Sequence, residues 1–413
     1  MSDAVLLACG SQSARGMCRD RREFQSYGVV KVGNPARIRG QLRAARERAV
    51  RLRYRRCNAR TGFAGLDGRG DLTVGESAAG TLTISNGGSV RNDWAFIGYV
   101  NGGDGTLTVT GVDGSGKASS WTSLSPVYIG ADPGSTGTLR ILDGGVAQSY
   151  SGTLGSSAGS VGTAIVSGPK STWNLNAANA FIIGADGKGT LHIDNGGAVR
   201  SGQGMIGWNT GGEGNVTVSG RASAWNPFNN IYVGFDGTGE LLVQDGATVH
   251  TEASTSPGAP ASIYIGQNAG GIGTVTVSST TGDISTLSAT DRINVGWAGT
   301  GALTVAKGGL AIAARDTWVA IDGTSTGTLN LTGDASGRGV LETGSVIKGA
   351  GNVTVNLDGG ILRANRDEGD FLRASPRRRW LPAAPGSTRT AARSAWAPRS
   401  RARPSSTSWE PAG

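Results

Sequence analysis

The chain is poor in cysteine. Its three cysteines, Cys9, Cys18 and Cys57, all lie within the first 60 of 413 residues. A disulfide framework and a thiol metal site are therefore excluded from the rest of the chain. The lack of cysteine is compatible with any compartment and suits a chain that is exported unfolded through an oxidising space.

Proline and long apolar runs are also scarce. Only 13 prolines occur and the glycines follow no every-third-residue rule, which excludes collagen. No stretch of about 18 consecutive apolar residues is present, which excludes a transmembrane helix. Hydrophobic residues make up 37% of the chain, too many for a disordered protein. Glycine is abundant, with 70 residues, so the composition favours a β-protein with many turns.

Positive charge is missing from the central part of the chain. Residues 1–60 carry 15 Lys and Arg against 4 Asp and Glu, and residues 374–413 carry 8 against 1. Since the totals are 39 and 30, residues 61–373 hold 16 basic and 25 acidic residues, a net charge of −9. A basic patch for nucleic acid is therefore excluded from this body by its sign, and no nucleic-acid partner is expected.

The body repeats three short phrases. The first begins with glycine and then alternates apolar and polar residues; its copies start at Gly80, Gly105, Gly137, Gly162, Gly189, Gly214, Gly239, Gly273, Gly301, Gly327 and Gly351. The second is a glycine pair after Asn, Asp or Lys, namely Gly87–Gly88, Gly144–Gly145, Gly196–Gly197, Gly308–Gly309 and Gly359–Gly360. The third ends in Ile-Gly or Val-Gly, at Gly130, Gly184, Gly234, Gly266 and Gly296. Several copies carry a tryptophan in place of the glycine pair, at Trp121, Trp173 and Trp225.

Each copy therefore predicts three short strands separated by turns. Alternation places Leu82 and Ile84 on one face of a strand, and Thr81 and Thr83 on the other. The paired glycines are expected at corners that need a positive φ. A unit of about 25 residues cannot bury its own apolar face, and stacked copies can. The prediction is an all-β parallel β-helix, or β-solenoid, of about eleven coils. A propeller and a leucine-rich repeat fit the phrases less well.

The phrases "GTLTISNGG", "GTLTVTG" followed by "SSW", and "YIGADPGSTGTL" resemble the passenger repeats of bacterial autotransporters, which use type V secretion. Some exosortase-sorted surface proteins carry similar repeats. The resemblance covers roughly residues 70 to 366. It implies a right-handed β-helical stalk on the outside of a Gram-negative cell, at the outer membrane or secreted, that serves adhesion. The family's usual partner is a C-terminal translocator barrel, which we do not find in this sequence, and no recognisable signal peptide is present.

Aromatic residues recur near the third phrase and suggest a binding stripe. Tyr128, Tyr232 and Tyr264 lie between inward-facing residues, so alternation turns them outward. Tyr99, Trp208, Phe235 and Trp297 directly follow the glycine of the phrase. Such a stripe suits a glycan or another ligand on a host or neighbouring cell. The alternative is that these rings only shield neighbouring coils.

Catalysis, metal and cofactors are not expected. Ser157 lies in a G-x-S-x-G match, but in a glycine-rich corner without the strand-to-helix turn that a nucleophile needs. The two histidines, His192 and His250, are 58 residues apart. The alternative function is a polysaccharide-degrading β-helix enzyme, a lyase or hydrolase. A cluster of carboxylates and arginines on neighbouring coils would favour it, and the repeat pattern shows none.

Three segments are predicted. Residues 1–69 form a basic flank that is either mis-started or partly helical, and residues 70–373 are the β-helix repeats. Residues 374–413 are rich in Ala, Arg, Pro and Ser and contain six of the 13 prolines. This tail is either disordered or the product of a shifted reading frame.

Overall fold

The computed structural model describes residues 70–253, 260–367 and 369–374, together with the backbone of five short strands before residue 70. All regular elements in these described residues are strands. Among them no helix is long and apolar enough to cross a membrane. The interpretation of residues 1–69 and 374–413 as flanks falls almost wholly outside the described residues.

The strands form three sheets, and each coil contributes one strand to each sheet in turn. The first sheet contains β1 (Ala4–Val5), β3 (Val29–Val32), β7 (Ala79–Ser85), β10 (Asp104–Thr110), β13 (Thr136–Leu142), β16 (Val161–Ser167), β19 (Lys188–Asp194), β22 (Glu213–Ser219), β25 (Thr238–Gln244), β28 (Ile272–Ser278), β31 (Thr300–Val305), β34 (Thr326–Asp334), β35 (Gly337–Arg338) and β38 (Asn352–Asp358). The second contains β5 (Gly65–Asp67), β8 (Ser89–Asn92), β11 (Ser120–Ser123), β14 (Val146–Ser149), β17 (Thr172–Leu175), β20 (Ala198–Ser201), β23 (Ala224–Pro227), β26 (Thr248–His250), β29 (Ser285–Ala289), β32 (Gly309–Ala313), β36 (Val340–Thr343) and β39 (Ile361–Ala364). The third contains β2 (Glu23–Ser26), β4 (Val50–Arg53), β6 (Leu72–Val74), β9 (Ala95–Ile97), β12 (Val127–Ile129), β15 (Gly152–Leu154), β18 (Phe181–Ile183), β21 (Gly204–Ile206), β24 (Ile231–Val233), β27 (Ile263–Ile265), β30 (Ile293–Val295), β33 (Thr317–Val319), β37 (Val346–Lys348) and β40 (Leu372–Ala374).

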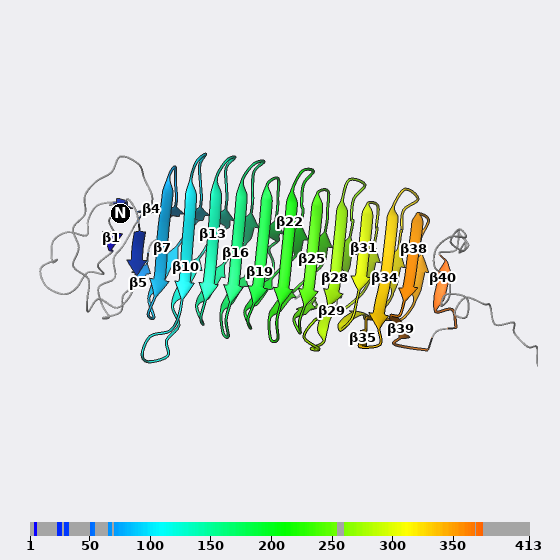
Figure 1. Cartoon of the computed structure of the whole chain (residues 1–413). Helices are drawn as coiled ribbons and strands as arrows, with labels where there is room; N and C mark the ends of the chain where they lie inside the picture. Colours follow the sequence, from blue (N-terminus) through cyan, green and yellow to red (C-terminus); the bar gives the residue numbers. More distant parts are fainter. Residues whose placement is uncertain are drawn as a thin grey trace, which may run out of the picture. The chain divides into compact units, whose positions relative to one another are not determined.

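Neighbouring coils pair strand to strand in parallel. From β7 to β38 the long strands of the first sheet lie side by side (Figure 1). Leu82 on β7 is in register with Leu107 on β10, which is in register with Leu139 on β13. The eleven long strands from β7 to β38 confirm the predicted parallel β-helix of about eleven coils.

Alternation places the apolar residues inside, as predicted. Leu82 and Ile84 are fully buried, whereas Thr81 and Thr83 on the same strand are partly exposed. The same pattern recurs in each long strand up to β34, so the Leu, Ile and Val side chains stack into one continuous core. Each buried Leu, Ile or Val contributes about 1.5–3 kcal/mol to stability relative to an exposed position.

Three tryptophans are fully buried in this core: Trp121, Trp173 and Trp225. Each indole N–H donates to an inward polar side chain of the preceding coil. The acceptors are Asn92 Oδ1 at 2.8 Å, Ser149 Oγ at 3.0 Å and Ser201 Oγ at 3.1 Å, respectively. A buried indole needs such a partner, since an unpaired N–H would destabilise the fold.

Trp225 is also accommodated by a glycine of the preceding coil. A Cβ added to Gly204 would lie 2.7 Å from Cζ2 of Trp225, closer than atoms can pack. The coil that supplies the hydrogen-bond acceptor Ser201 therefore also supplies the space for the ring. Two adjacent coils thus act as one packing unit.

We expect Ser201→Ala to lower the free energy of unfolding by about 1–3 kcal/mol, because it leaves the buried N–H of Trp225 without an acceptor. Trp225→Phe removes the N–H, so adding it to Ser201→Ala should cost less than the sum of the two single changes. Thermal unfolding of the four proteins measures this coupling. Additive losses would show that the hydrogen bond contributes nothing to stability.

The predicted corner glycines fall into two kinds. Gly87, Gly144 and Gly196 have φ between 71° and 85°, and the residue before each has a positive φ of 51° or 52°. Two such residues in succession are typical of a type I′ turn, which Asn-Gly and Asp-Gly favour. The second glycine of a pair is needed for a different reason, which is that the backbone of the preceding coil lies too close for a side chain. A Cβ on Gly145 or Gly197 would collide with a backbone carbonyl of the preceding coil.

One repeat boundary was predicted wrongly. The last copy of the first phrase was placed at Gly351, but Gly327 is in register with Val353. The copy is therefore shifted by two residues, and Val353, Val355 and Leu357 take the inward positions. The segment "GNVTV" matches the first phrase in sequence because Gly351 precedes a strand with the same alternation of polar and apolar residues.

Candidate binding surface

From β6 to β40 the central residue of each strand in the third sheet lies between two inward-facing residues, and these central residues form a column along the sheet. We call it the outer column. In coil order it reads Thr73, Phe96, Tyr128, Thr153, Ile182, Met205, Tyr232, Tyr264, Asn294, Trp318, Ile347 and Arg373.

A second column runs beside it from β9 to β30, formed by the residue after the glycine that follows each of these strands. We call it the turn column. It contains Tyr99, Ala131, Ser156, Ala185, Trp208, Phe235, Gln267 and Trp297. The backbone N–H of each of these residues donates to the coil before, for example Trp297 to Gly266 at 2.9 Å. The register of the coils therefore fixes both columns.

The seven aromatic residues of the predicted stripe lie in these columns but form two separate clusters. Ring contacts join Tyr99 and Tyr128 to Phe96 and Trp94, at centroid distances of 4.4–6.3 Å. The second cluster, which we call the C-terminal cluster, contains Trp208, Tyr232, Phe235, Tyr264 and Trp297. Between the two clusters the outer column carries Thr153, Ile182 and Met205.

Rings in the C-terminal cluster pack closely on one another. Tyr232 and Tyr264 stack at 4.9 Å between centroids and 10° between planes, and Trp208 and Phe235 stack at 4.2 Å. Trp297 packs its edge against Tyr264 at 5.4 Å and is 36% exposed. Such contacts hold the rings in fixed orientations. The cluster therefore presents a rigid, partly exposed aromatic surface.

The phenol of Tyr264 is half-buried. Burial raises its pKa, and the neighbouring Tyr232 adds to the effect, whereas a hydrogen bond with Ser262 opposes it. The hydroxyl is protonated at neutral pH, as an ordinary phenol is, and the raised pKa keeps it protonated to a more alkaline pH.

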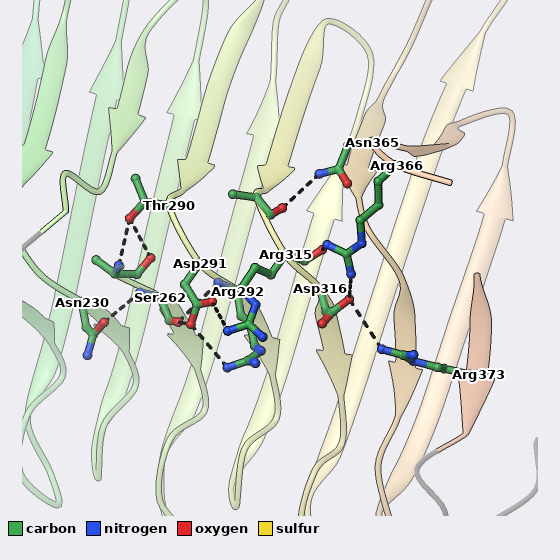
Figure 2. Close-up of polar contacts among 12 residues, drawn as sticks. Asn230, Ser262, Thr290, Asp291, Arg292, Arg315, Asp316, Asn365, Arg366 and Arg373 are labelled. Carbon is green, nitrogen blue, oxygen red and sulfur yellow. Dashed lines mark hydrogen bonds and ion pairs between the residues drawn. The ribbon is translucent and has the colours of Figure 1, made fainter. Parts of the chain in front are cut away.

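Polar side chains continue the surface at the corner before the third sheet (Figure 2). Asn230 accepts the backbone N–H of Ser262 at 2.8 Å and donates its amide to the hydroxyl of Tyr232 at 3.1 Å. Ser262 in turn donates to Asp291 at 3.0 Å. The polar groups of three successive coils are therefore linked to the C-terminal cluster.

Two carboxylates on neighbouring coils are held by arginines (Figure 2). Asp291 lies 3.4 Å from Arg292 and 3.5 Å from Arg315. Asp316 lies 2.7 Å from Arg366 and 3.9 Å from Arg373. The side chains of both aspartates are about nine-tenths buried, so the guanidinium groups balance charges that would be costly alone.

Arg366 reaches Asp316 from a distant part of the sequence. It follows β39 and also donates to the carbonyl of Arg315 at 3.2 Å. A Cβ on Gly344 would collide with the guanidinium carbon of Arg366, so a glycine at this position leaves room for the arginine side chain. The sequence signal for this contact is weak, because 50 residues separate its two ends.

Several buried polar atoms near this surface have no hydrogen-bond partner: Gln267 Oε1, Arg292 Nε, Asn294 Oδ1 and Trp318 Nε1. Asn294 and Trp318 are neighbours in the outer column. Neither Asn294 nor Trp318 is in the predicted stripe, because neither fits the pattern of the tyrosines, an aromatic residue two positions before a glycine. Each is the central residue of its strand, β30 or β33, so the alternation of inward and outward residues was the signal that could have placed them in the outer column.

The other candidate residues lie apart. His192 faces outward on β19 between Ile165 and Thr217. The backbone of Ser157 bonds the hydroxyl of Ser160 in a turn. No group of three or more His, Cys, Asp or Glu that could hold a metal ion occurs in the part of the chain that the structure describes.

Comparison with known proteins finds one partial similarity. No family model and no solved structure matches the sequence. The curated "Uncharacterized lipoprotein YdeK" of Escherichia coli (strain K12) is 32% identical to this chain over 117 residues. Those residues are 27% of this chain and 8% of YdeK, so the match spans less than a tenth of that relative's length. The chain is thus a parallel β-helix with a partial likeness to a bacterial lipoprotein.

Proposed function

We propose that the chain is the β-helical part of a surface-displayed protein of the autotransporter passenger type, and that it serves adhesion without catalysis. The observation that carries the proposal is the C-terminal cluster, in which five aromatic side chains from four coils form one partly exposed surface. Partly exposed aromatic surfaces of this kind suit sugars and partner proteins. The name of the partly similar relative, a lipoprotein, supports a location at a bacterial surface.

The test is binding of the full chain to an immobilised array of neutral and acidic oligosaccharides. We expect retention on part of the array, and about tenfold weaker binding after Trp208→Ala combined with Trp297→Ala, since each lost aromatic contact is worth about 0.5–1.5 kcal/mol. Thr217→Ala, on the outer face of the first sheet, is the matched control. Retention by none of the glycans, or equal binding by the aromatic variant, would contradict glycan adhesion.

A polysaccharide-degrading enzyme remains the second candidate, because Asp291 and Asp316 lie on neighbouring coils beside arginines. An acid or base in such an enzyme must reach the substrate. Here both carboxylates are buried against guanidinium groups, which suits a structural role better. Release of new reducing ends from a bound polysaccharide, lost in Asp291→Asn, would establish the enzyme instead.

A further inference from the structure

The apolar core of the β-helix is open at its C-terminal end. In the last described coil the inward apolar residues of all three strands are only partly buried; they are Val353, Val355, Leu357, Leu362 and Leu372. Leu329 and Leu331, in the same positions one coil earlier, are fully buried. The last coil therefore presents an apolar surface that a further layer of strands would cover.

The last long strand, β38, also has a free backbone edge. In the described part of the chain its one ladder partner is β34. The N–H of Asn352 donates to the carbonyl of Ser325 in the preceding coil at 2.8 Å. Because the backbone groups of successive residues point to opposite edges of a strand, those of Val353, Val355 and Leu357 point to the free edge. An exposed strand edge is a template for pairing with another strand.

This edge has none of the residues that usually protect an edge strand. The sequence of β38, NVTVNLD, contains no Lys, Arg or Pro, and its one charge, on Asp358, is at the end of the strand. On the outer face, Asn356 donates to Asn330 at 2.8 Å, and Asn330 donates to Thr304 at 3.1 Å. The next donor in this series would come from a further strand beside β38.

The sequence after β40 does not supply another coil. Residues 375–413 contain no Val or Ile, one Leu and six prolines. A coil of this β-helix needs alternating apolar residues and backbone N–H donors, and proline has no N–H. The strand that fits the free edge must therefore come from another molecule.

The opposite end of the core already carries a strand. β3 pairs in parallel with β7, where Val30 is in register with Leu82. Leu82 and Ile84 on β7 are fully buried. Head-to-tail addition of copies, which gives open filaments, would need both ends of the core to be free. The partner that fits an open C-terminal end is therefore a second C-terminal end.

We propose that the C-terminal coil is a self-association surface, through which two copies of the chain pair end to end about a two-fold axis. The axis passes through Val355, so β38 pairs in antiparallel fashion with β38 of the second copy. Val355 lies opposite its own counterpart, and Val353 lies opposite Leu357, which continues the core. The free N–H and C=O groups of these residues bond across the axis. On the outer face Thr354 lies opposite Asn356, whose amide oxygen accepts from the threonine hydroxyl.

The charges at this interface include one unfavourable pair. Along β38 no like charges meet, because Asp358 lies opposite Asn352. The same axis places β39 opposite β40 of the second copy, and thus Arg363 near Arg373. Each arginine already lies near a carboxylate of its own copy, at 3.2 and 3.9 Å. We therefore expect the pairing to tighten as salt screens the two arginines.

Pairing gives one particle two C-terminal clusters. Since the axis exchanges the second and third sheets, the clusters of the two copies face different directions. One dimer can therefore hold two separate ligands, which raises avidity without a new contact. The pairing itself does not depend on what the aromatic surface binds.

The mass of the full chain in solution tests the proposal, measured by sedimentation equilibrium over a wide range of protein concentration. We expect a monomer–dimer equilibrium without larger species. Val355→Lys places two like charges on the axis and should weaken the dimer about tenfold or more. Thr276→Lys, on the outer face of β28 and away from this end, is the matched control.

A charge swap tests the register. Val355→Asp alone should also weaken pairing, but a mixture of Val355→Asp and Val355→Lys should form a mixed dimer, because opposite charges then meet on the axis. The same two charges at Thr276 should leave pairing unchanged. Val355 is partly exposed, so each variant should keep its circular dichroism spectrum.

Hydrogen exchange of the unchanged chain gives a readout that needs no substitution. Protection of the N–H groups of Val353, Val355 and Leu357 should rise with protein concentration, since the second copy supplies their acceptors. The N–H of Asn352 bonds within its own copy and is the internal control.

The remaining outcomes overturn the pairing. A monomer at every concentration does so, and protection of β38 in that monomer would show that the same chain covers this end. Larger assemblies, or a dimer that Val355→Lys leaves unchanged, place the contact elsewhere. Failure of the Asp and Lys variants to pair when mixed excludes an axis through Val355. None of these results bears on glycan binding, which the oligosaccharide array tests separately.

Discussion

Leu191→Asp is expected to unfold the coils around β19. Leu191 is fully buried and is in register with Ala164 on one side and Val216 on the other, both of them in the core. A carboxylate at this position has no partner, so we expect a loss of at least about 4 kcal/mol in the free energy of unfolding. Hydrogen exchange measured strand by strand should show lost protection that is greatest in β16, β19 and β22.

Thr190→Asp is the matched control, since Thr190 lies on the same strand but on its outer face. This variant should change stability by less than about 0.5 kcal/mol, the usual range for a surface substitution. Equal protection in the two variants would show that the strand does not separate an inner from an outer face.

The cost of Leu191→Asp should also depend on pH. Burial raises the pKa of the new carboxyl above its unfolded value of about 3.9, so the folded state binds more protons than the unfolded state at any pH between the two values. Stability therefore falls as the pH rises through this range and recovers as the pH is lowered. Leu191→Asn, which does not titrate, should show no such recovery relative to the unchanged chain.

Much of the coil could be predicted from local patterns. Alternation alone separates Leu82 from Thr81, because a strand has only two faces. Asn-Gly and Asp-Gly predict corners such as Asn86–Gly87, because few other residue pairs tolerate two positive φ values. These signals are repeated in coil after coil, so one irregular copy does not obscure the fold.

Contacts between coils were harder to predict. The inward direction of Trp121 depends on its register with Val90 of the preceding coil, and its acceptor Asn92 is 29 residues away. The pairing of Asp316 with Arg366 depends on a turn that passes over Gly344. The aromatic stripe was predicted as continuous, because its spacing in the sequence does not show which coils lack a ring.

Gly130→Ala is expected to destabilise the protein far more than Gly144→Ala, although both glycines have a positive φ, of 68° and 85°. The left-handed conformation costs an alanine about 1–2 kcal/mol at either position. At Gly144 that is the whole cost, because the nearest atom to the new Cβ would be Cγ1 of Val112 at 3.6 Å, an ordinary contact.

At Gly130 the new Cβ would also overlap the carbonyl of Val161 in the next coil. Backbone that is paired in a parallel ladder cannot move aside as a side chain can, so we add about 1–3 kcal/mol for the overlap. Thermal unfolding of the two variants should therefore place Gly130→Ala clearly below Gly144→Ala, with protection lost mainly in β12, β13 and β16. Similar melting temperatures would show that the glycines at this corner are needed for their φ alone and that the coils can separate to admit a methyl group.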